Sequence, residues 1–413
     1  MARRGWAMST DGAGRSGRRY RAAGLLAVVA LLATSAIGYR VFVPRDTLDR
    51  AQQPYPAPAA PTPRLYGLIL NMPLVVDGRL RVYAAQREVW ADEPVDMRAS
   101  MSPYWAYRRW PATLLGVAAV GRTVVSRWSD GELVGIDATR GTIAWRVRGP
   151  AITAGYAGRR TGAATVYDPP GLFTAGPVLV AAGDRGVRAY DAGTGRPLWT
   201  KTVAGCAGGS FSTFDTIVLA CGRGLSTVEA FDAATGQARS WTVSGDGLRP
   251  FACAVGRSGC RGVRTPGHAW VIGAGAALTA ADELADPATW LVGDVVVVPR
   301  PDGSIAGRAL GGQQLWSWPL GGAAPDGARV VAVQQGEVHL LTADRELVSV
   351  DPADGLELCR LALTGDGEFM FDPGYVYASD GFVFVERLRP GARPGDSNTR
   401  YYYPSPNVLA TGT

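Results

Sequence analysis

The sequence predicts an all-β protein: an eight-bladed β-propeller of four-stranded antiparallel blades, preceded by one N-terminal transmembrane helix. Three observations lead to this prediction. A pattern of strands and Gly turns recurs from about residue 65 onward. Gly (54 residues) and Pro (28 residues) are abundant, as many short strands joined by tight turns require. An uncharged run, residues 22–39, follows an arginine-rich N-terminus.

The N-terminal residues have the pattern of a membrane anchor. The uncharged run 22–39 is close to the lower end of the roughly 17–25 residues that cross a bilayer as a helix. Six Arg and one acid, Asp11, precede this run, so residues 1–21 carry +5 of the formal net charge of +6. The positive-inside rule therefore predicts a cytoplasmic basic tail (1–21), a signal-anchor helix (22–43) and an extracytoplasmic domain. A cleaved signal peptide is the alternative, because residues 34–36 are small enough to be cut.

A Pro-rich linker is expected at 44–64, before a propeller at 65–410. Residues 51–64 contain five prolines, which favours a polyproline II spacer. At ~3.1 Å per residue, such a spacer would hold the folded domain roughly 40 Å from the bilayer.

The repeat itself predicts the blades. Each unit reads as a strand, a Gly turn, a strand ending in Asp, an Asp-x-x-x-Gly turn and a strand ending in Trp. Three units align closely, at 123–145, 178–199 and 217–241. Weaker copies lie at 294–316 and 337–359, a degenerate copy at 251–273, and a first and a last unit at 74–90 and 375–388. Eight units of roughly 44 residues match four-stranded propeller blades.

The repeated Asp and Trp residues are interpreted as structural. Asp and Gly set a tight turn between the third and fourth strands, and a Trp can bury a large face between adjacent blades. The positions are Asp137, Trp145, Asp191, Trp199, Asp232, Trp241, Trp316 and Asp351. Ligand binding by the Asp residues is the alternative reading.

The motif Asp-Ala-x-x-Gly-x-x-x-Trp after a Val- and Tyr-rich strand resembles the repeat of pyrroloquinoline-quinone (quinoprotein) propellers. It is also similar to that of the propeller subunit of the outer-membrane β-barrel assembly machinery. The resemblance covers residues 65–410 and implies the fold, but this fold hosts both enzymes and scaffolds.

Catalytic signatures are missing from the sequence. The resemblance implies that a quinone-dependent dehydrogenase would need adjacent cysteines and an Asn-containing calcium site. No cysteines are adjacent, and Asn occurs only at 71, 398 and 407. The two histidines, His268 and His339, are too few for a His-rich metal site. We therefore expect no enzyme activity, no cofactor and no metal. Nucleic-acid binding is not expected, because the charge outside residues 1–21 is nearly balanced.

Five cysteines fall on the extracytoplasmic side of the predicted topology, where disulfides persist. Cys253 and Cys260 flank a Gly-containing turn, so a short hairpin disulfide is expected between them. Cys206 and Cys221 could bridge neighbouring strands of one blade. Cys359 stands where the repeat has Trp, which suggests a buried free thiol.

One segment is a candidate for partner binding. Residues 103–111 read PYWAYRRWP, and Tyr, Trp and Arg are enriched in interface hot spots. The candidate contact residues are Tyr104, Trp105, Tyr107, Arg108, Arg109 and Trp110. An outer strand packed on the first blade is the structural alternative. At the other end of the chain, residues 400–409 are expected to complete the last blade, with a disordered tail as the alternative.

The function expected is that of a non-catalytic protein-interaction scaffold in the bacterial cell envelope. The expected localisation is the cell membrane, with a single pass and an extracytoplasmic C-terminal domain. A protein partner is the leading expectation. A sensor for a small ligand such as a cell-wall sugar, and a quinone-dependent dehydrogenase, are the alternatives.

Overall fold

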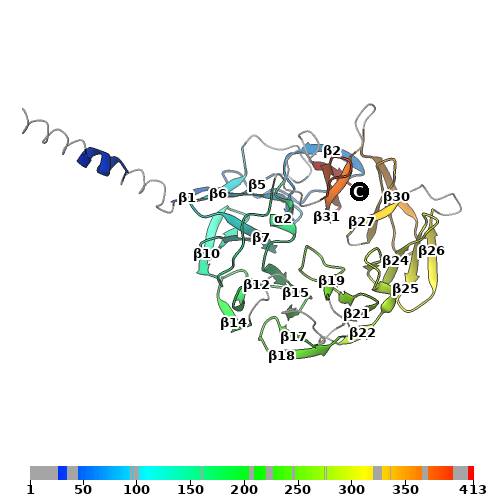
Figure 1. The fold of residues 1–413 in the computed structure, drawn as a ribbon. Coiled ribbons are helices and arrows are strands. Elements are labelled where there is room, and N and C mark those ends of the chain that lie inside the picture. Colours follow the sequence, from blue (N-terminus) through cyan, green and yellow to red (C-terminus); the bar gives the residue numbers. More distant parts are fainter. Residues whose placement is uncertain are drawn as a thin grey trace, which may run out of the picture.

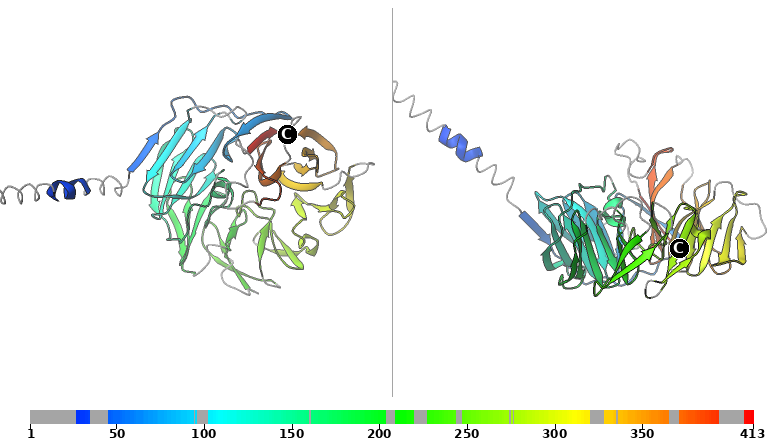
Figure 2. Two further views of the ribbon diagram at one scale, coloured as in Figure 1. Left: turned by 45° about the horizontal axis from the view of Figure 1, so that its top comes forward. Right: turned by 60° about the horizontal axis from the view of Figure 1, so that its bottom comes forward.

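The fold is an eight-bladed β-propeller, shown by a computed structural model (Figure 1). The structure describes residues 27–34, 45–93, 95, 102–159, 161–203, 209–219, 227–243, 247–273, 275, 277–319, 328–334, 336–364, 371–393 and 408–413. Eight antiparallel sheets surround a common axis; seven have four strands and one has five. Figure 2 shows the same ring tilted, with the blades side by side around it.

The strands of the first four blades follow one another along the chain. Blade 1 holds β3 (Leu74–Val76), β4 (Leu80–Ala85), β5 (Glu88–Asp92) and β6 (Trp105–Trp110). Blade 2 holds β7 (Leu114–Val120), β8 (Thr123–Trp128), β9 (Glu132–Asp137) and β10 (Thr142–Arg148). Blade 3 holds β11 (Leu172–Ala175), β12 (Val178–Gly183), β13 (Gly186–Asp191) and β14 (Pro197–Lys201). Blade 4 holds β15 (Phe211–Ser212), β16 (Thr216–Leu219), β17 (Thr227–Asp232) and β18 (Ala238–Thr242).

The remaining blades complete the ring. Blade 5 holds β19 (Arg249–Phe251), β20 (Gly262–Thr265), β21 (His268–Ile272) and β22 (Leu278–Ala280), followed by the short 3-10 helix η2 (Asp282–Leu284). Blade 6 holds β23 (Trp290–Val292), β24 (Val295–Pro299), β25 (Ile305–Ala309) and β26 (Gln314–Trp318). Blade 7 holds β27 (Arg329–Gln334), β28 (Glu337–Leu341), β29 (Glu346–Val350) and β30 (Glu357–Ala362). Blade 8 holds β31 (Asp372–Ser379), β32 (Phe382–Leu388), β33 (Val408–Gly412) and β2 (Arg64–Ile69).

The repeated Asp closes a turn by accepting hydrogen bonds from the residues that follow it. Oδ1 of Asp191 accepts from the backbone N (2.9 Å) and Oγ1 (2.7 Å) of Thr194, and Gly195 N donates to the Asp191 carbonyl (2.8 Å). The hydrogen bond from the Thr194 side chain holds the pKa of the Asp191 carboxyl below its ordinary value. Asp137, Asp232 and Asp351 close the equivalent turns in blades 2, 4 and 7.

The repeated Trp docks each blade on the next. Nε1 of Trp145, on the outer strand of blade 2, donates to the Ala192 carbonyl in the Asp191 turn of blade 3 (3.0 Å). Trp199 donates in the same way to the Ala233 carbonyl (2.7 Å) and Trp316 to the Pro352 carbonyl (2.7 Å). Trp241 is buried in one cluster with residues of blade 5, which lacks the Asp turn. Asp and Trp therefore form one joint between blades.

The two ends of the described propeller meet in blade 8. Strand β2 pairs antiparallel with β33, with Leu68 opposite Leu409, and β33 pairs with β32. The outermost strand of the last blade thus comes from residues 64–69, and the ring has no open edge between its first and last segments. Of the predicted closing segment 400–409, residues 400–407 lie outside the described residues.

The segment before β2 differs from the free spacer that its prolines suggest. Strand β1 (Arg45–Asp49) pairs with β6 and becomes a fifth strand on blade 1. Residues 51–64 then run along the propeller: Ala51 N donates to the Arg140 carbonyl (3.1 Å) and Arg79 Nη1 to the Pro56 carbonyl (2.6 Å). A proline-rich chain leaves its carbonyls unpaired within itself, so these neighbouring donors can hold it against the blades.

Residues 27–34 form a helix. Within the part of the chain that the structure describes, no helix has the length and apolar character needed to span a bilayer.

A buried histidine beside the closing blade makes stability depend on pH. Burial lowers the pKa of the His339 imidazole to about 4 from 6.5, and Gln334 and Ser349 hydrogen-bond its two nitrogens. The unfolded chain therefore binds a proton that the folded chain excludes between about pH 6.5 and about pH 4. We expect the free energy of unfolding to fall by about 3 kcal/mol as the pH drops through this window.

Denaturant titrations at neutral pH and near pH 4.5 would measure this loss. A His339→Gln variant is the control, because it retains a polar side chain that does not titrate there. An equal loss of stability in both proteins would contradict the assignment to His339.

Candidate functional site

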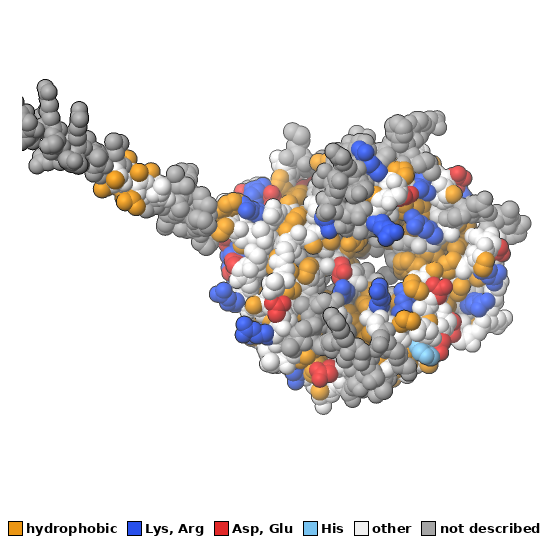
Figure 3. Space-filling model, viewed as in Figure 1, with side chains coloured by type: hydrophobic (Ala, Val, Ile, Leu, Met, Phe, Trp, Pro, Cys, Tyr) orange, Lys and Arg blue, Asp and Glu red, His pale blue; other side chains and the backbone are white. Residues whose placement is uncertain are grey.

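The centre of the ring contains two hollows. The larger, of about 640 Å³, is lined by residues of blades 5 to 8, among them Leu291, Val333 and Tyr377, with Arg261, Glu337 and Asp380 as charged groups. The smaller, of about 290 Å³, is lined mainly by apolar residues from the inner strands β3, β7 and β11 and from helix α2 (Ala163–Tyr167). Figure 3 shows the centre hollowed on this face, with Lys and Arg side chains around it.

A disulfide-closed loop separates the two hollows. Residues 253–260, here called the disulfide loop, connect β19 to β20, and residues 254, 255 and 259 line both hollows. Cys253 and Cys260 form the disulfide that the sequence predicts. Cys206 and Cys221 lie outside the described residues. Among the described cysteines, Cys359, on β30, is a free thiol, as predicted, but it is half-buried and not fully buried.

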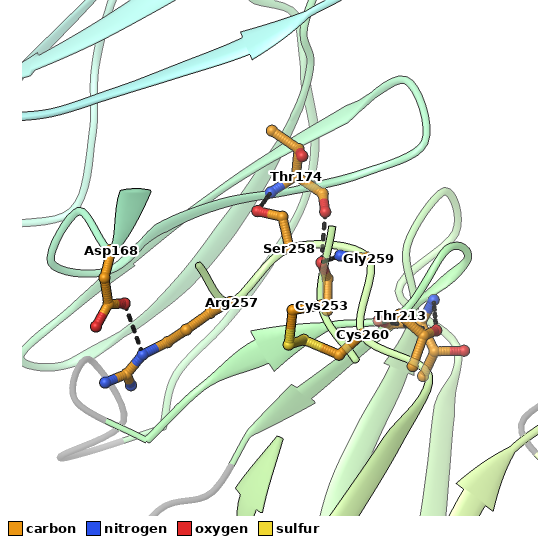
Figure 4. The surroundings of a disulfide bond; sticks show 10 residues. Asp168, Thr174, Thr213, Cys253, Arg257, Ser258, Gly259 and Cys260 are labelled. Atoms are coloured by element: carbon orange, nitrogen blue, oxygen red, sulfur yellow. Dashed lines mark hydrogen bonds and ion pairs between the residues drawn. A yellow bond between two sulfur atoms is a disulfide. The ribbon is translucent and has the colours of Figure 1, made fainter. Parts of the chain in front are cut away.

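The disulfide loop is held by blades 3 and 4 and by the segment after α2 (Figure 4). Thr174 N donates to Ser258 Oγ (3.0 Å), and Arg257 pairs with Asp168 (2.9 Å). Gly256 has φ of +55°, and a Cβ there would lie 1.5 Å from the Tyr167 carbonyl oxygen, so only glycine fits. These contacts fix the loop across the centre of the propeller.

Helix α2 is anchored in the same region by a buried carboxylate. Glu386 on β32 is 1% exposed and accepts hydrogen bonds from Thr161 Oγ1 and from Tyr375 N (3.1 Å). Burial raises the pKa of the Glu386 carboxyl. Tyr167 Oη also donates to the Pro73 carbonyl (2.6 Å). The connection between blades 2 and 3 is thereby joined to blades 1 and 8.

The predicted partner-binding segment lies on β6, and only part of it is accessible. The side chains of Tyr104, Trp105, Tyr107 and Arg109 are buried, whereas Arg108 and Trp110 are exposed. Trp105 is the docking residue of blade 1, since its Nε1 donates to the Ala138 carbonyl in the Asp137 turn (3.1 Å). The prediction that all six residues contact a partner is therefore wrong for the four buried ones, and for Arg108 and Trp110 it stays a prediction.

An ion cluster fastens β1 over β6. Arg109 contacts Asp46 (3.2 Å), Asp130 (2.9 Å) and Glu132 (2.7 Å), and Arg146 also pairs with Asp46. Burial alone would raise the pKa of the Asp46 carboxyl, but the hydrogen bonds from Arg146 and Tyr107 and the charge of Arg109 outweigh it and lower the pKa. Asp46 is thus an ionised anchor for β1 at neutral pH.

Replacing Asp46 with Asn is expected to loosen β1 and to accelerate tryptic cleavage at Arg45 and Arg50 by about tenfold, because charge-assisted hydrogen bonds are lost. Since the pKa of Asp46 is depressed, its contribution is present at neutral pH and is lost as the pH falls below 3.8. Asp49→Asn is the matched control: Asp49 pairs with Arg108 at the exposed edge, where ion pairs contribute little. Equal cleavage of both variants would contradict the anchoring role of Asp46.

A shallow groove of about 630 Å³ follows the outer edge of blade 1. It is lined by Arg45, Thr47, Arg87, Glu88, Arg108 and Trp110, among others. The guanidinium of Arg87 lies 3.3 Å from the centre of the Trp110 ring, a stacked cation–π contact. The two exposed residues of the predicted segment therefore belong to a defined surface, here called the blade-1 groove.

Sequence reasoning missed the residues at the centre of the ring. The pair Cys253 and Cys260 signals a hairpin but not its position at the axis. Nothing in the local pattern indicates that α2 and Glu386 meet there. Among the described residues, no group of three or more His, Cys, Asp or Glu side chains could hold a metal ion.

Comparison with known proteins identifies the family. The model of the family described as outer membrane protein assembly factor BamB matches residues 76–241 and, in an overlapping match, 129–330. Together these matches cover more than half of the chain. The chain belongs to the BamB family.

Several solved structures are similar to the chain at low sequence identity. The crystal structure of BamB from Moraxella catarrhalis is 12% identical and covers 83% of this chain and 98% of its own, with a TM-score of 0.42. The designed protein Ika8 is 16% identical, covering 85% and 100%, with a TM-score of 0.48. A europium-containing methanol dehydrogenase is 13% identical, covering 79% and 84%, with a TM-score of 0.41. No curated protein sequence matches the chain.

Proposed function

We propose that this BamB-family propeller is a non-catalytic protein-interaction scaffold of the bacterial cell envelope. Residues 22–43 hold it in the cell membrane, and the propeller lies outside. The family description, an assembly factor for outer membrane proteins, supports a protein partner in the envelope. The basic residues before the uncharged run support the orientation.

The observation that carries the proposal is the larger central hollow. Its walls come from blades 5 to 8 and combine apolar side chains such as Leu291 and Val333 with the charged groups Arg261, Glu337 and Asp380. Protein-binding surfaces likewise combine apolar area with polar and charged groups. The disulfide loop lines this hollow and is held in place, because it is hydrogen-bonded to blades 3 and 4.

In-cell photo-crosslinking tests the proposal. Benzoylphenylalanine in place of Ser379, which lines the hollow, is expected to give a discrete protein adduct. The same residue in place of Gln314, on the exposed outer strand of blade 6, is the matched control. Adducts of the same proteins at equal yield from both positions, or none from position 379, would contradict a partner site at the hollow.

The volume of the hollow also favours a second candidate, the binding of a small ligand. At about 640 Å³ it falls within the roughly 300–1,000 Å³ typical of small-molecule sites. A cell-wall sugar that raised the melting temperature in a concentration-dependent manner would support a sensor. Such a shift, lost in an Asp380→Asn variant, would favour the sensor over the scaffold.

Membrane anchoring is tested separately. A reporter that is active only in the cytoplasm, fused after Thr413, is expected to be silent. Strong reporter activity would place the C-terminus in the cytoplasm and contradict the proposed orientation.

A further inference from the structure

The proposed anchor keeps blade 1 within a short distance of the bilayer. Tyr39, the last residue of the uncharged run, is six residues before Arg45, where β1 begins. Six residues reach at most about 20 Å when fully extended. Because β1 is paired with β6 over all five of its positions, this limit applies to the outer edge of blade 1 itself.

The blade-1 groove lies on that edge and carries uncompensated positive charge. Arg108 is paired with Asp49 (2.8 Å) and Glu88 (2.7 Å). Arg45 and Arg87 have no carboxylate partner among the residues that the structure describes. Two guanidinium groups are thus available for an anion in the groove.

The aromatic residue of the groove suits the boundary of a bilayer. Trp110 is 38% exposed, and Arg45 is its partner across the β1–β6 pair. Arg87 stacks on its ring. Trp is enriched where membranes meet water, and Arg near an anionic surface is attracted to the lipid phosphates.

We propose that the blade-1 groove binds the phosphate groups of anionic phospholipids in the membrane that anchors the chain, so that the propeller stands with blade 1 toward the bilayer. This inference rests on the proposed anchoring by residues 22–43. Arg45 and Arg87 bind the phosphates, and Trp110 contacts the interface beside them. With the outer edge of blade 1 toward the bilayer, the central hollow, which blades 5 to 8 line, opens along the membrane plane and remains accessible to a protein partner.

The full chain in lipid nanodiscs provides the test. Benzoylphenylalanine in place of Thr47, an exposed residue of the groove, is expected to form a lipid adduct on illumination, detected as a mass shift. The same residue in place of Gln314 should form little. Adducts should be more abundant in discs of mixed phosphatidylcholine and phosphatidylglycerol than in phosphatidylcholine alone, and salt should reduce them.

Paired substitutions test the role of the two arginines. Each Arg near an anionic surface contributes a factor of about five to the ratio of docked to undocked propeller. Arg45→Ser with Arg87→Ser should therefore lower this ratio by about 25-fold. Arg249→Ser with Arg308→Ser removes the same charge from exposed positions on blades 5 and 6 and should leave the adduct yield unchanged.

The outcomes separate this inference from the proposed anchoring. Equal lipid adducts from positions 47 and 314, or equal losses from the two double variants, would overturn the groove proposal while the chain remains in the discs. A full chain that fails to enter the discs at all would instead overturn the anchoring.

Discussion

Replacing Trp145 with Ala is expected to lower the free energy of unfolding by about 3–5 kcal/mol. The indole is enclosed on both sides by glycines: an added Cβ would lie 2.2 Å from its ring at Gly135 of the same blade and 2.6 Å at Gly195 of the next blade. Neither neighbour can fill the space that the ring leaves. The substitution also leaves the Ala192 carbonyl without its hydrogen bond.

Trp145→Phe is the control that separates packing from hydrogen bonding. Phenylalanine retains most of the ring contacts but loses the Nε1 donor, so a loss of about 1 kcal/mol is expected for the hydrogen bond. Denaturant titration of the three proteins measures both steps. A Trp145→Ala variant as stable as the parent would show that Trp145 does not hold blades 2 and 3 together.

Deleting residues 408–413 is expected to cost on the order of 5–10 kcal/mol, from lost apolar burial and lost ladder hydrogen bonds. Val408 and Leu409 are fully buried, and β33 is the only link between β2 and β32 in the described blade. The cost is comparable to the whole stability of many domains, so we expect a chain without cooperative unfolding.

Deletion of Thr413 alone is the matched control. It removes the hydrogen bonds that Thr413 N (2.9 Å) and Oγ1 (3.3 Å) donate to the Gly381 carbonyl and the one that Oγ1 accepts from Gln334 Nε2 (3.2 Å), and it leaves β33 intact. Its melting temperature should remain close to that of the full chain. Cooperative unfolding of the longer deletion at an unchanged temperature would contradict closure of the ring by β33.

The repeat made the blades predictable because each blade is a local unit. Asp191 and Thr194 lie three residues apart, and the turn that they form depends on little else. Blade 1 departs from this local pattern. Its docking residue, Trp105, is separated from β5 by residues 93–104, so the regular interval that identified the other docking residues is missing. Without that interval, the sequence groups Trp105 with its aromatic neighbours as a contact residue.

The centre of the ring could not be predicted because its contacts join distant segments. Arg127 is buried and donates to the carbonyls of Pro150 (2.8 Å), Gly171 (2.8 Å) and Ala182 (2.7 Å). Glu386 and Thr161 meet across more than half of the chain. No periodicity in the sequence signals such pairs, since they follow from closing the ring and not from any one blade.

The pairing of β2 with β33 has a consequence for biosynthesis. Ile69 leaves the ribosome about 340 residues before its partner Val408, a delay of roughly half a minute at the usual rate of about 5–20 residues per second. During this time β2 has no strand to pair with, so its unpaired backbone edge and the Ile69 side chain, which is buried in the folded blade, are open to other chains. Blades 2 to 7 each come from one continuous segment and can form as they emerge, but blade 8 must wait for β33, residues 408–412. An export chaperone that covered residues 64–69 until then would protect the nascent protein from pairing with the wrong strand.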